Sequence, residues 1–266
     1  MPVLTFDVIA LATLVPAGLV RWRGQDSRDL WYFAALLLAI AGPIATVAWQ
    51  LSGGEWRTGF AQSLWLTIAA TMILFLALTL IERQGWRLTP ILTPILVLLG
   101  LLATIWQRTP ERPMAATVPP GWLDAHIVFA ILTYGLITLG AVTGIAVLLQ
   151  ERALKTKHPT ALSTRLPAIA DAERMEVRLL VGAEIILALN LLSGVGAEQF
   201  LHGSMMPLDH KVGFSLAAFV VLGGLLLFRW RAGVRGRRGA RWALLAYLLL
   251  TLAYPGVKFV TDVLMA

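Results

Sequence analysis

The sequence contains no cysteine among its 266 residues. This absence excludes disulfide frameworks, thiolate zinc sites, C-x-x-C redox chemistry and covalent attachment of a c-type haem. Any chemistry in this protein must therefore use histidine, carboxylate, amide or aromatic side chains.

Charged residues are also scarce. Asp, Glu, Lys and Arg make up 14% of the chain and apolar residues 58%, whereas a soluble domain has about 25% and roughly 45–50%. Both departures indicate a chain that lies mainly in lipid. At about 20 residues per crossing, eight spans would use most of the chain and leave too little for a separate soluble domain. We therefore expect a single transmembrane domain over residues 1–266.

Continuous apolar runs predict an all-α fold, a polytopic membrane helix bundle of about eight transmembrane helices. Each run is long enough to cross a bilayer as a helix. The first six residues carry no Lys or Arg, so the first run lacks the basic start of a signal peptide and is expected to remain as a span. The predicted spans are residues 3–20, 30–51, 59–81, 89–106, 125–150, 178–197, 210–228 and 241–262.

The basic residues predict the orientation of the bundle. Loops after the first, third, fifth and seventh spans hold 17 of the 22 Lys and Arg residues. By the positive-inside rule these loops are cytoplasmic, and both termini lie outside. The net charge of +7 is then explained by topology, so no nucleic acid is expected as a partner. The arginine-rich segment 229–241 contains no acid and is expected to contact anionic membrane lipids.

The ten tryptophans fall near the predicted ends of the spans. Aromatic belts are expected at both interfaces because indole combines an apolar body with a polar N–H group. We interpret one set as an inner belt, namely Trp22, Trp31, Trp86, Trp230 and Trp242. The second set is interpreted as an outer belt and contains Trp49, Trp56, Trp65, Trp106 and Trp122.

Two of the four histidines open predicted spans. His126 begins the fifth span and His210 the seventh, and both spans run from outside to inside. The two imidazoles are therefore expected at the same membrane depth, near the outer face. Asp124 and Asp209 precede them and are predicted to cap the helix starts by accepting hydrogen bonds from free N–H groups of the first turn.

A neutral imidazole is the form that a metal ion or haem iron requires. His126 and His210 on neighbouring helices would ligate one haem iron axially, and Tyr134 follows the same helix face as His126. Ordinary polar contacts at helix starts are the alternative explanation, and spacing alone leaves both open. His158 and His202 are interpreted as loop residues.

Other polar groups fall within the predicted spans, where they are costly and are candidates for function. Glu184 is interpreted either as a protonated, hydrogen-bonded side chain or, with Asn190, as a midplane polar site. Lys258 and Asp262 are spaced as an i, i+4 ion pair. Alternatively, Lys258 and Lys211 face the carboxylates of an anionic ligand such as haem propionates.

Six motifs occur in order along the last three-quarters of the chain. They are HIVFAILTY (126–134), LPAIADAERM (166–175), SG (193–194), LDHKVGFSL (208–216), VRGRRGARW (234–242) and AYPGVKFV (253–260). Over residues 60–262 the sequence resembles the cytochrome c assembly (CcsA/CcmC-like) family of integral membrane proteins, in its short YpjD- or HemX-like branch.

The resemblance implies haem handling. His126 matches the outer-face haem-ligand histidine of the family, and His210 stands where it would supply a substitute second ligand. The expected protein is therefore a non-enzymatic, multi-pass protein of the bacterial inner membrane that holds haem b non-covalently. Its expected partners are haem, membrane lipids and other cytochrome c maturation components.

Departures from the family pattern bear on the activity. Residues 196–209 contain no tryptophan, where the full family has a tryptophan-rich outer segment, and Leu227 stands where larger members place a membrane-embedded histidine. These departures favour haem binding, delivery or regulation over a complete haem synthetase. A small-solute or ion transporter and a b-type haem electron-transfer subunit are the alternatives.

Overall fold

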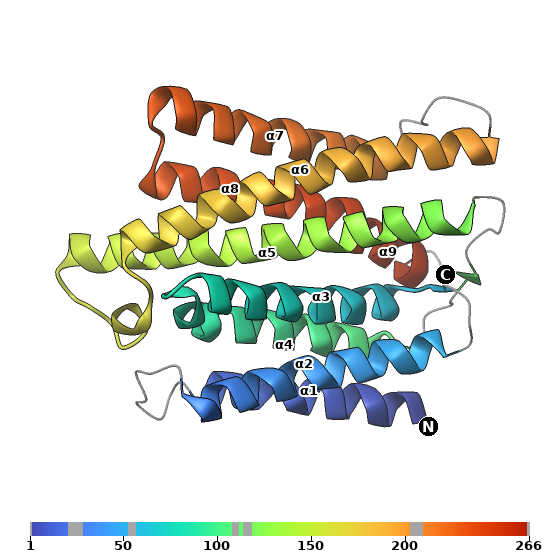
Figure 1. Cartoon of the computed structure of the whole chain (residues 1–266), viewed down its shortest axis with the longest axis horizontal. Helices are drawn as coiled ribbons and strands as arrows, with labels where there is room; N and C mark the ends of the chain where they lie inside the picture. Colours follow the sequence, from blue (N-terminus) through green and yellow to red (C-terminus); the bar gives the residue numbers. More distant parts are fainter. Residues whose placement is uncertain are drawn as a thin grey trace. The chain divides into compact units, whose positions relative to one another are not determined.

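The computed structural model describes residues 2–20, 29–52, 57–107, 112–113, 119–202 and 210–264, and these are almost entirely helical (Figure 1). A two-residue antiparallel pair, β1 (Arg57–Thr58) with β2 (Arg112–Pro113), is the one addition to the predicted all-α class within these ranges. The helices are α1 (Pro2–Val20), α2 (Leu30–Leu51), α3 (Phe60–Ile81), η2 (Gly85–Leu88), α4 (Thr89–Ile105), α5 (Pro120–Thr156), η3 (Ser163–Arg165), α6 (Ile169–His202), α7 (His210–Ala232), α8 (Gly236–Thr251), η4 (Leu252–Gly256), α9 (Val257–Phe259) and η5 (Val260–Leu264).

Within the described residues, seven helices are long and apolar enough to cross a membrane. Large apolar side chains on their outer faces are exposed, for example Val220 at 70% and Leu192 at 68%, as expected for helices whose outer surface contacts lipid. The polytopic helical bundle is thereby confirmed. The apolar stretch of α1, Leu4–Leu19, is shorter than the other seven, so its role as an eighth span stays a prediction.

The chain divides into two compact units. Unit 1 comprises residues 1–114, 165–167 and 258–266, and unit 2 comprises residues 115–164 and 168–257. Unit 1 therefore contains α1 to α4, and unit 2 contains α5 to α8. The expectation of one transmembrane domain stays a prediction.

The core of unit 1 is built around Trp65 on α3, which is fully buried. Gly100 on α4 makes room for it, since a Cβ at this glycine would lie 3.3 Å from Cη2 of Trp65. Trp86 on η2 is also buried and packs edge-on to Tyr32 at 6.0 Å between ring centroids. The belt interpretation is therefore wrong for Trp65 and Trp86, because helix packing and not the membrane interface surrounds their rings.

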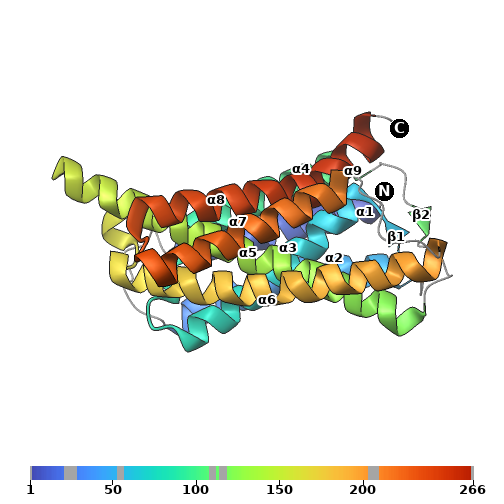
Figure 2. The ribbon, with the colours of Figure 1, turned by 90° about the horizontal axis from the view of Figure 1, so that it is seen from above.

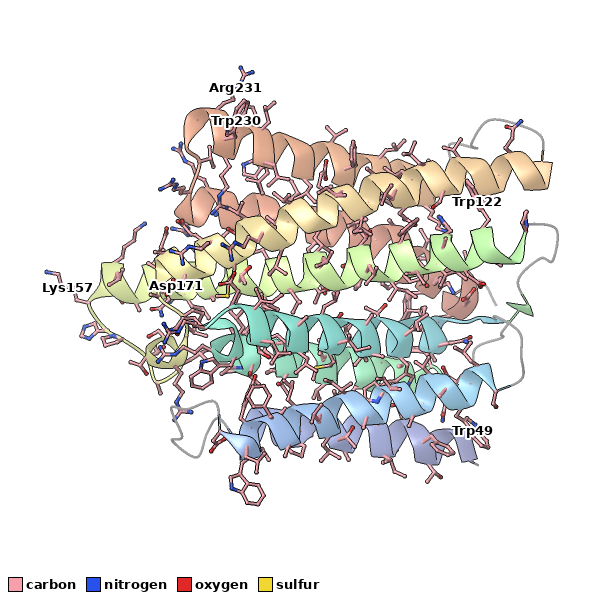
Figure 3. All side chains as sticks on the ribbon, in the orientation of Figure 1. Trp49, Trp122, Lys157, Asp171, Trp230 and Arg231 are labelled. Carbon is pink, nitrogen blue, oxygen red and sulfur yellow. The ribbon has the colours of Figure 1, made fainter. Side chains whose placement is uncertain are left out.

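Five other tryptophans are exposed, in keeping with interfacial belts: Trp31, Trp49, Trp122, Trp230 and Trp242. Figure 3 shows Trp49 and Trp230 on the outside of their helices. Trp106 on the C-terminal side of α4 is partly buried and contacts Phe60 and Phe259 edge-on. Trp22 and Trp56 lie outside the described residues.

The beginning of α1 and the segment around α9 lie at one end of unit 1. Phe6 stacks on Trp49 near the end of α2, with 4.9 Å between ring centroids. Lys258 donates a hydrogen bond from Nζ to the carbonyl oxygen of Gly59 at 3.4 Å, just before α3 begins. The two ends of the chain are therefore on the same side, as predicted; that this side faces outside stays a prediction.

Unit 2 is a bundle of four successively antiparallel helices, α5 to α8 (Figures 1 and 2). Two glycines of α5 pack against α6: a Cβ at Gly140 would lie 2.7 Å from Cδ2 of Leu180, and one at Gly144 would lie 3.0 Å from Oε1 of Glu176. The glycines let the two helices approach closely, as small residues do in membrane bundles. The buried core of the unit includes Tyr134, Ile137, Leu180, Ala183, Leu187, Ala218, Leu222, Leu225, Ala243, Ala246 and Leu250.

Helices α5 and α6 are much longer than the spans predicted at 125–150 and 178–197. They have 37 and 34 residues, and at 1.5 Å per residue α5 is about 55 Å long, well beyond a hydrocarbon core of about 30 Å. Apolar runs mark the part of a helix that lies in lipid and not where the helix ends. The polar residues assigned to the loop 151–178 therefore partly belong to the helices.

The start of α8, which is part of the arginine-rich segment 229–241, contacts acidic side chains of other helices. Glu173 on α6 accepts a hydrogen bond from the backbone N–H of Gly236, and Glu151 on α5 accepts one from the N–H of Arg237 at 2.9 Å. These carboxylates satisfy free N–H groups of the first turn of α8 and complement its dipole. The segment contains no acid in sequence, but α5 and α6 supply the acids in space.

Regular α-helix is interrupted after Thr251. The segment η4 is π-helical and contains Pro255, and η5 is π-helical as well. Proline has no N–H to donate and its ring clashes with the preceding turn, which disrupts the α-helical pattern. The i, i+4 pairing of Lys258 with Asp262 stays a prediction; Lys258 lies in α9, and Asp262 lies in the π-helical η5.

Candidate functional site

The candidate site is centred on His126, which lies at the end of unit 2 opposite the arginine-rich segment. Helix α5 begins at Pro120, with Pro119 as its N-cap, and proline suits a first helical turn because its missing N–H is not needed there. The prediction that Asp124 caps this helix is therefore wrong: Asp124 is already inside α5 and exposed. His126 lies in the second turn, partly buried.

The His126 imidazole is held by α6. Its Nδ1 lies 2.8 Å from Oγ of Ser193, and the Ser193 hydroxyl donates to the carbonyl oxygen of Asn190 at 2.9 Å. The Asn190 carbonyl also accepts from the imidazole. Because a hydroxyl has one proton and a carbonyl can only accept, the network assigns the proton of the neutral ring to Nδ1.

The tautomer leaves Nε2 of His126 with a lone pair. A histidine that donates from Nδ1 to a fixed acceptor and has a free Nε2 has the arrangement of a metal-ligating histidine, in which the second hydrogen bond fixes the tautomer and the ring orientation.

Trp122 contacts the same part of α6 and was interpreted from sequence only as a belt residue. Its indole Nε1 donates to the carbonyl oxygen of Ser193 at 2.8 Å. Gly196 leaves room for the indole ring, and a Cβ at Gly194 would lie 3.3 Å from Cε1 of His126. Trp122 and His126 are one helical turn apart, and this i, i+4 spacing was the available signal that both side chains face one neighbouring helix.

The structure places His210 differently from His126. His210 is the first residue of α7 and is exposed, and no contact joins it to His126 in the described part of the chain. The next residue, Lys211, is close enough to His126 for its positive charge to act on the imidazole. Asp209, its predicted cap, lies outside the described residues, as do the side chain of His202 and the segment 203–209.

Tyr134 belongs to the packing between α5 and α8. It is buried, and its hydroxyl lies 3.0 Å from Oγ1 of Thr251, which donates to the carbonyl of Tyr247 at 2.8 Å. The Tyr134 hydroxyl is therefore the donor to Thr251. The ring also packs against that of Tyr247, at 5.8 Å between centroids.

Two further predicted residues lie elsewhere. Lys258 belongs to unit 1, where its ammonium contacts the start of α3. Glu184 on α6 lies against Gly223 of α7, where a Cβ would be 2.7 Å from its Oε1. The Oε2 atom of Glu184 is buried and has no hydrogen-bond partner within the described ranges.

The donor set at this site suits a haem iron better than a bare metal ion. Within the residues that the structure describes, no group of three or more His, Cys, Asp or Glu side chains is arranged to hold a metal ion. Haem iron needs only one or two protein ligands because the porphyrin supplies the other four. His126, whose Nε2 carries the lone pair in this tautomer, would hold such an iron, and the positive charge of Lys211 would be available to a haem carboxylate.

The chain is similar to a protein family and to individual known proteins. A family model described as cytochrome C assembly protein matches residues 30–265. A 28.8 kDa protein from the nifR3-like 5′ region of Azospirillum brasilense is 45% identical, with 98% of each chain covered.

More distant relatives cover nearly the whole chain as well. Inner membrane protein YpjD of Escherichia coli strain K12 is 26% identical over 96% of this chain and 95% of its own. Cytochrome c biogenesis protein CcsA of Synechococcus sp. strain CC9311 is 24% identical over 97% of this chain and 95% of its own. No solved structure matches the chain. The family model matches all but a short part of the chain. The chain therefore belongs to the cytochrome c assembly protein family.

Proposed function

We propose that this protein takes part in cytochrome c biogenesis as a non-enzymatic haem-handling protein of the inner membrane. Family membership supports the biogenesis role, and relatives include a protein named for cytochrome c biogenesis and one named for the inner membrane. The observation that carries the haem assignment is the Nδ1–H hydrogen bond from His126 to Ser193, which leaves Nε2 available.

In this proposal His126 would hold the iron of haem b, which would be bound without a covalent link. Ser193 positions the imidazole, and Lys211 offers a positive charge for a propionate. His210, exposed at the first residue of α7, would supply a second ligand to the same iron. When bound, the haem supplies the iron chemistry, and the chain supplies its orientation and its release.

The partners that follow from this role are haem, membrane lipids and other cytochrome c maturation components. The position of the site supports delivery at one face of the membrane, because His126 lies seven residues into a 37-residue helix. By the charge distribution this face is the outer one. Delivery or regulation of delivery is the proposed task, since the chain lacks cysteine for thiol chemistry.

The test is the haem content of protein purified from haem-replete cells, measured by the Soret band and a pyridine haemochrome spectrum. We expect haem in the wild type, loss of most of it in His126→Ala, and a partial loss in His210→Ala. The matched control is His158→Ala, which removes an exposed histidine from the loop after α5 and should leave the haem content unchanged. Wild-type protein without haem, or a His126→Ala variant as rich in haem as the wild type, would contradict the proposal.

A transporter remains the second candidate because of Glu184. A buried carboxylate oxygen without a hydrogen-bond partner within the described residues is costly in a membrane span and is a common mark of an ion or proton pathway. This candidate predicts proton- or solute-dependent flux in proteoliposomes that is lost in Glu184→Gln and kept in His126→Ala. The haem proposal instead predicts that haem content is lost in His126→Ala and kept in Glu184→Gln.

A further inference from the structure

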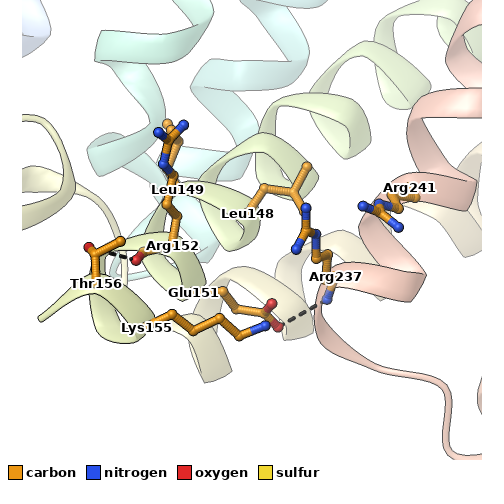
Figure 4. Close-up of a pocket in the computed structure, with 8 residues that line it drawn as sticks. All are labelled: Leu148, Leu149, Glu151, Arg152, Lys155, Thr156, Arg237 and Arg241. Atoms are coloured by element: carbon orange, nitrogen blue, oxygen red, sulfur yellow. Dashed lines mark hydrogen bonds between the residues drawn. The ribbon is translucent and has the colours of Figure 1, made fainter.

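A cavity of about 490 Å³ lies between the ends of α5 and α8, at the end of unit 2 opposite His126. Its lining is shown in Figure 4 and consists of Leu148, Leu149, Glu151, Arg152, Lys155, Thr156, Arg237 and Arg241. The sequence assigned Arg152 and Lys155 to a solvated loop. Because α5 continues to Thr156, these two residues instead stand on a helix facing the arginines of α8.

The cavity has an excess of positive charge. Lys155 extends toward Arg237, which lies on α8 with Arg241, whereas the side chain of Arg152 extends away from them (Figure 4). Glu151 is the only acid in the lining, and its carboxylate accepts the backbone N–H of Arg237 at 2.9 Å. It holds the start of α8 in place and offsets one of the four positive charges, so the lining keeps an excess of three.

The charge and the lining together indicate the chemistry of the ligand. Arginine guanidinium groups bind phosphate oxygens with paired N–H donors, and lysine adds a mobile point charge. Leu148 and Leu149 add an apolar wall next to these cations. A phosphate with an attached glycerol and the start of acyl chains fits such a lining, whereas a free inorganic anion would leave the leucines without a contact.

We propose that this cavity is a binding site for the phosphate of an anionic phospholipid headgroup. The arginine-rich end of the bundle is the one that charge asymmetry assigns to the cytoplasmic side, where anionic lipids attract basic residues and where basic pockets between helices bind acidic headgroups. The site is distinct from the His126 site and does not depend on haem.

The test compares the binding of dioleoyl phosphatidylglycerol and dioleoyl phosphatidylcholine to the detergent-purified full chain by native mass spectrometry. The test variant is Lys155→Gln/Arg241→Gln, which removes one cation from each wall. The matched control is Arg235→Gln/Arg238→Gln, which removes two exposed arginines of the same segment that do not line the cavity. Both variants lose the same charge, so an effect of net charge alone is the same in both.

We expect wild type and control to bind phosphatidylglycerol in preference to phosphatidylcholine, and the test variant to lose affinity for phosphatidylglycerol by about 30-fold. Inorganic pyrophosphate is added as a soluble competitor. Weak or absent displacement of bound phosphatidylglycerol supports a lipid, and not a free phosphate, as the ligand. Equal lipid binding by all three proteins would overturn the proposal. So would pyrophosphate binding by the wild type without any preference between the two lipids. The thermal midpoint of each variant in phosphatidylcholine verifies that the fold is intact.

Discussion

Arg229 on α7 donates a hydrogen bond from Nη1 to Oε2 of Glu176 on α6 at 2.7 Å, and both side chains are shielded, with 9% and 1% of their surface exposed. A second Arg229 nitrogen, Nη2, donates to the carbonyl of Glu173 at 3.4 Å. Gly144 on α5 leaves the space that the Glu176 carboxylate occupies. One ion pair thus joins α6 and α7 at the arginine-rich end of unit 2, and α5 packs closely against it at Gly144.

The replacement Arg229→Gln should strongly destabilise unit 2. Removing one partner leaves the Glu176 carboxylate buried without its counter-charge, which typically costs about 3–5 kcal/mol. The measurement is the thermal midpoint of the purified protein in detergent. Arg231→Gln is the control, because Arg231 is exposed and lies only over the ring of Trp230 on the surface (Figure 3). Equal midpoints for the two variants would show that the pair does not stabilise the bundle.

The hydrogen bond from His126 to Ser193 gives a prediction that depends on the proposed function. Ser193→Ala removes the acceptor that fixes the imidazole tautomer, and loss of such a positioning group commonly weakens metal binding by about 10- to 100-fold. Haem titration of the apoprotein measures this. Ser193→Thr keeps a hydroxyl and should restore binding. If the alanine variant binds haem like the wild type, Ser193 does not position the ligand.

Replacing Gly196 tests whether this glycine is needed for close packing, and replacing Gly213 measures the general effect of removing a glycine from a helix. A Cβ at this position would collide with the ring of Trp122, whereas a Cβ at Gly213 on α7 meets no atom within 4 Å. Gly196→Ala should therefore lower the thermal midpoint by an overpacking cost of about 1–3 kcal/mol. Gly213→Ala should leave the midpoint unchanged or raise it slightly, since alanine favours helix. The opposite order would show that α5 and α6 do not approach closely here.

Tyr134→Phe distinguishes a cofactor contact from a packing role. The variant loses the hydrogen bond to Thr251 but keeps the ring that packs on Tyr247. We expect a loss of about 0.5–1.5 kcal/mol of stability and an unchanged Soret band. A Soret band that shifts or disappears while the thermal midpoint stays constant would instead assign Tyr134 to the haem site, as its predicted position on the same helix face as His126 suggested.

The orientation of the bundle can be measured because the chain has no cysteine of its own. Gly121→Cys places a thiol at the exposed start of α5, and His158→Cys places one in the exposed loop after its end. A membrane-impermeant maleimide should label Gly121→Cys in intact cells and His158→Cys only after permeabilisation. The reverse pattern would invert the predicted topology, with the basic loops outside.

Hydropathy predicted the spans well but not the ends of the longest helices. The stretches that follow residue 150 and precede residue 178 are polar, and both were placed outside the predicted spans. In the structure they continue α5 and α6, because a helix that leaves lipid keeps its backbone hydrogen bonds in water. The basic cavity was missed for this reason, since it needs Lys155 on a helix facing Arg241.

Contacts between helices were the other part that a single sequence does not contain. His126 was identified from its position at the start of a span, but its partner Ser193 is 67 residues away, and no periodicity pairs two such residues. Trp65 was assigned to an interface because its position along the span was known and its neighbours on α1 and α4 were not. The sequence therefore identified candidate functional residues, but their contacts with other helices could be seen only in the structure.

Helix α5 is a single uninterrupted rod of 37 residues, and it carries both His126 and Lys155. At 1.5 Å per residue the two are about 44 Å apart along its axis. A tilt of roughly 5° about one end moves the other by about 4 Å. A rigid-body tilt of α5 at the histidine site would therefore also change the spacing between the cations at the other end of the helix.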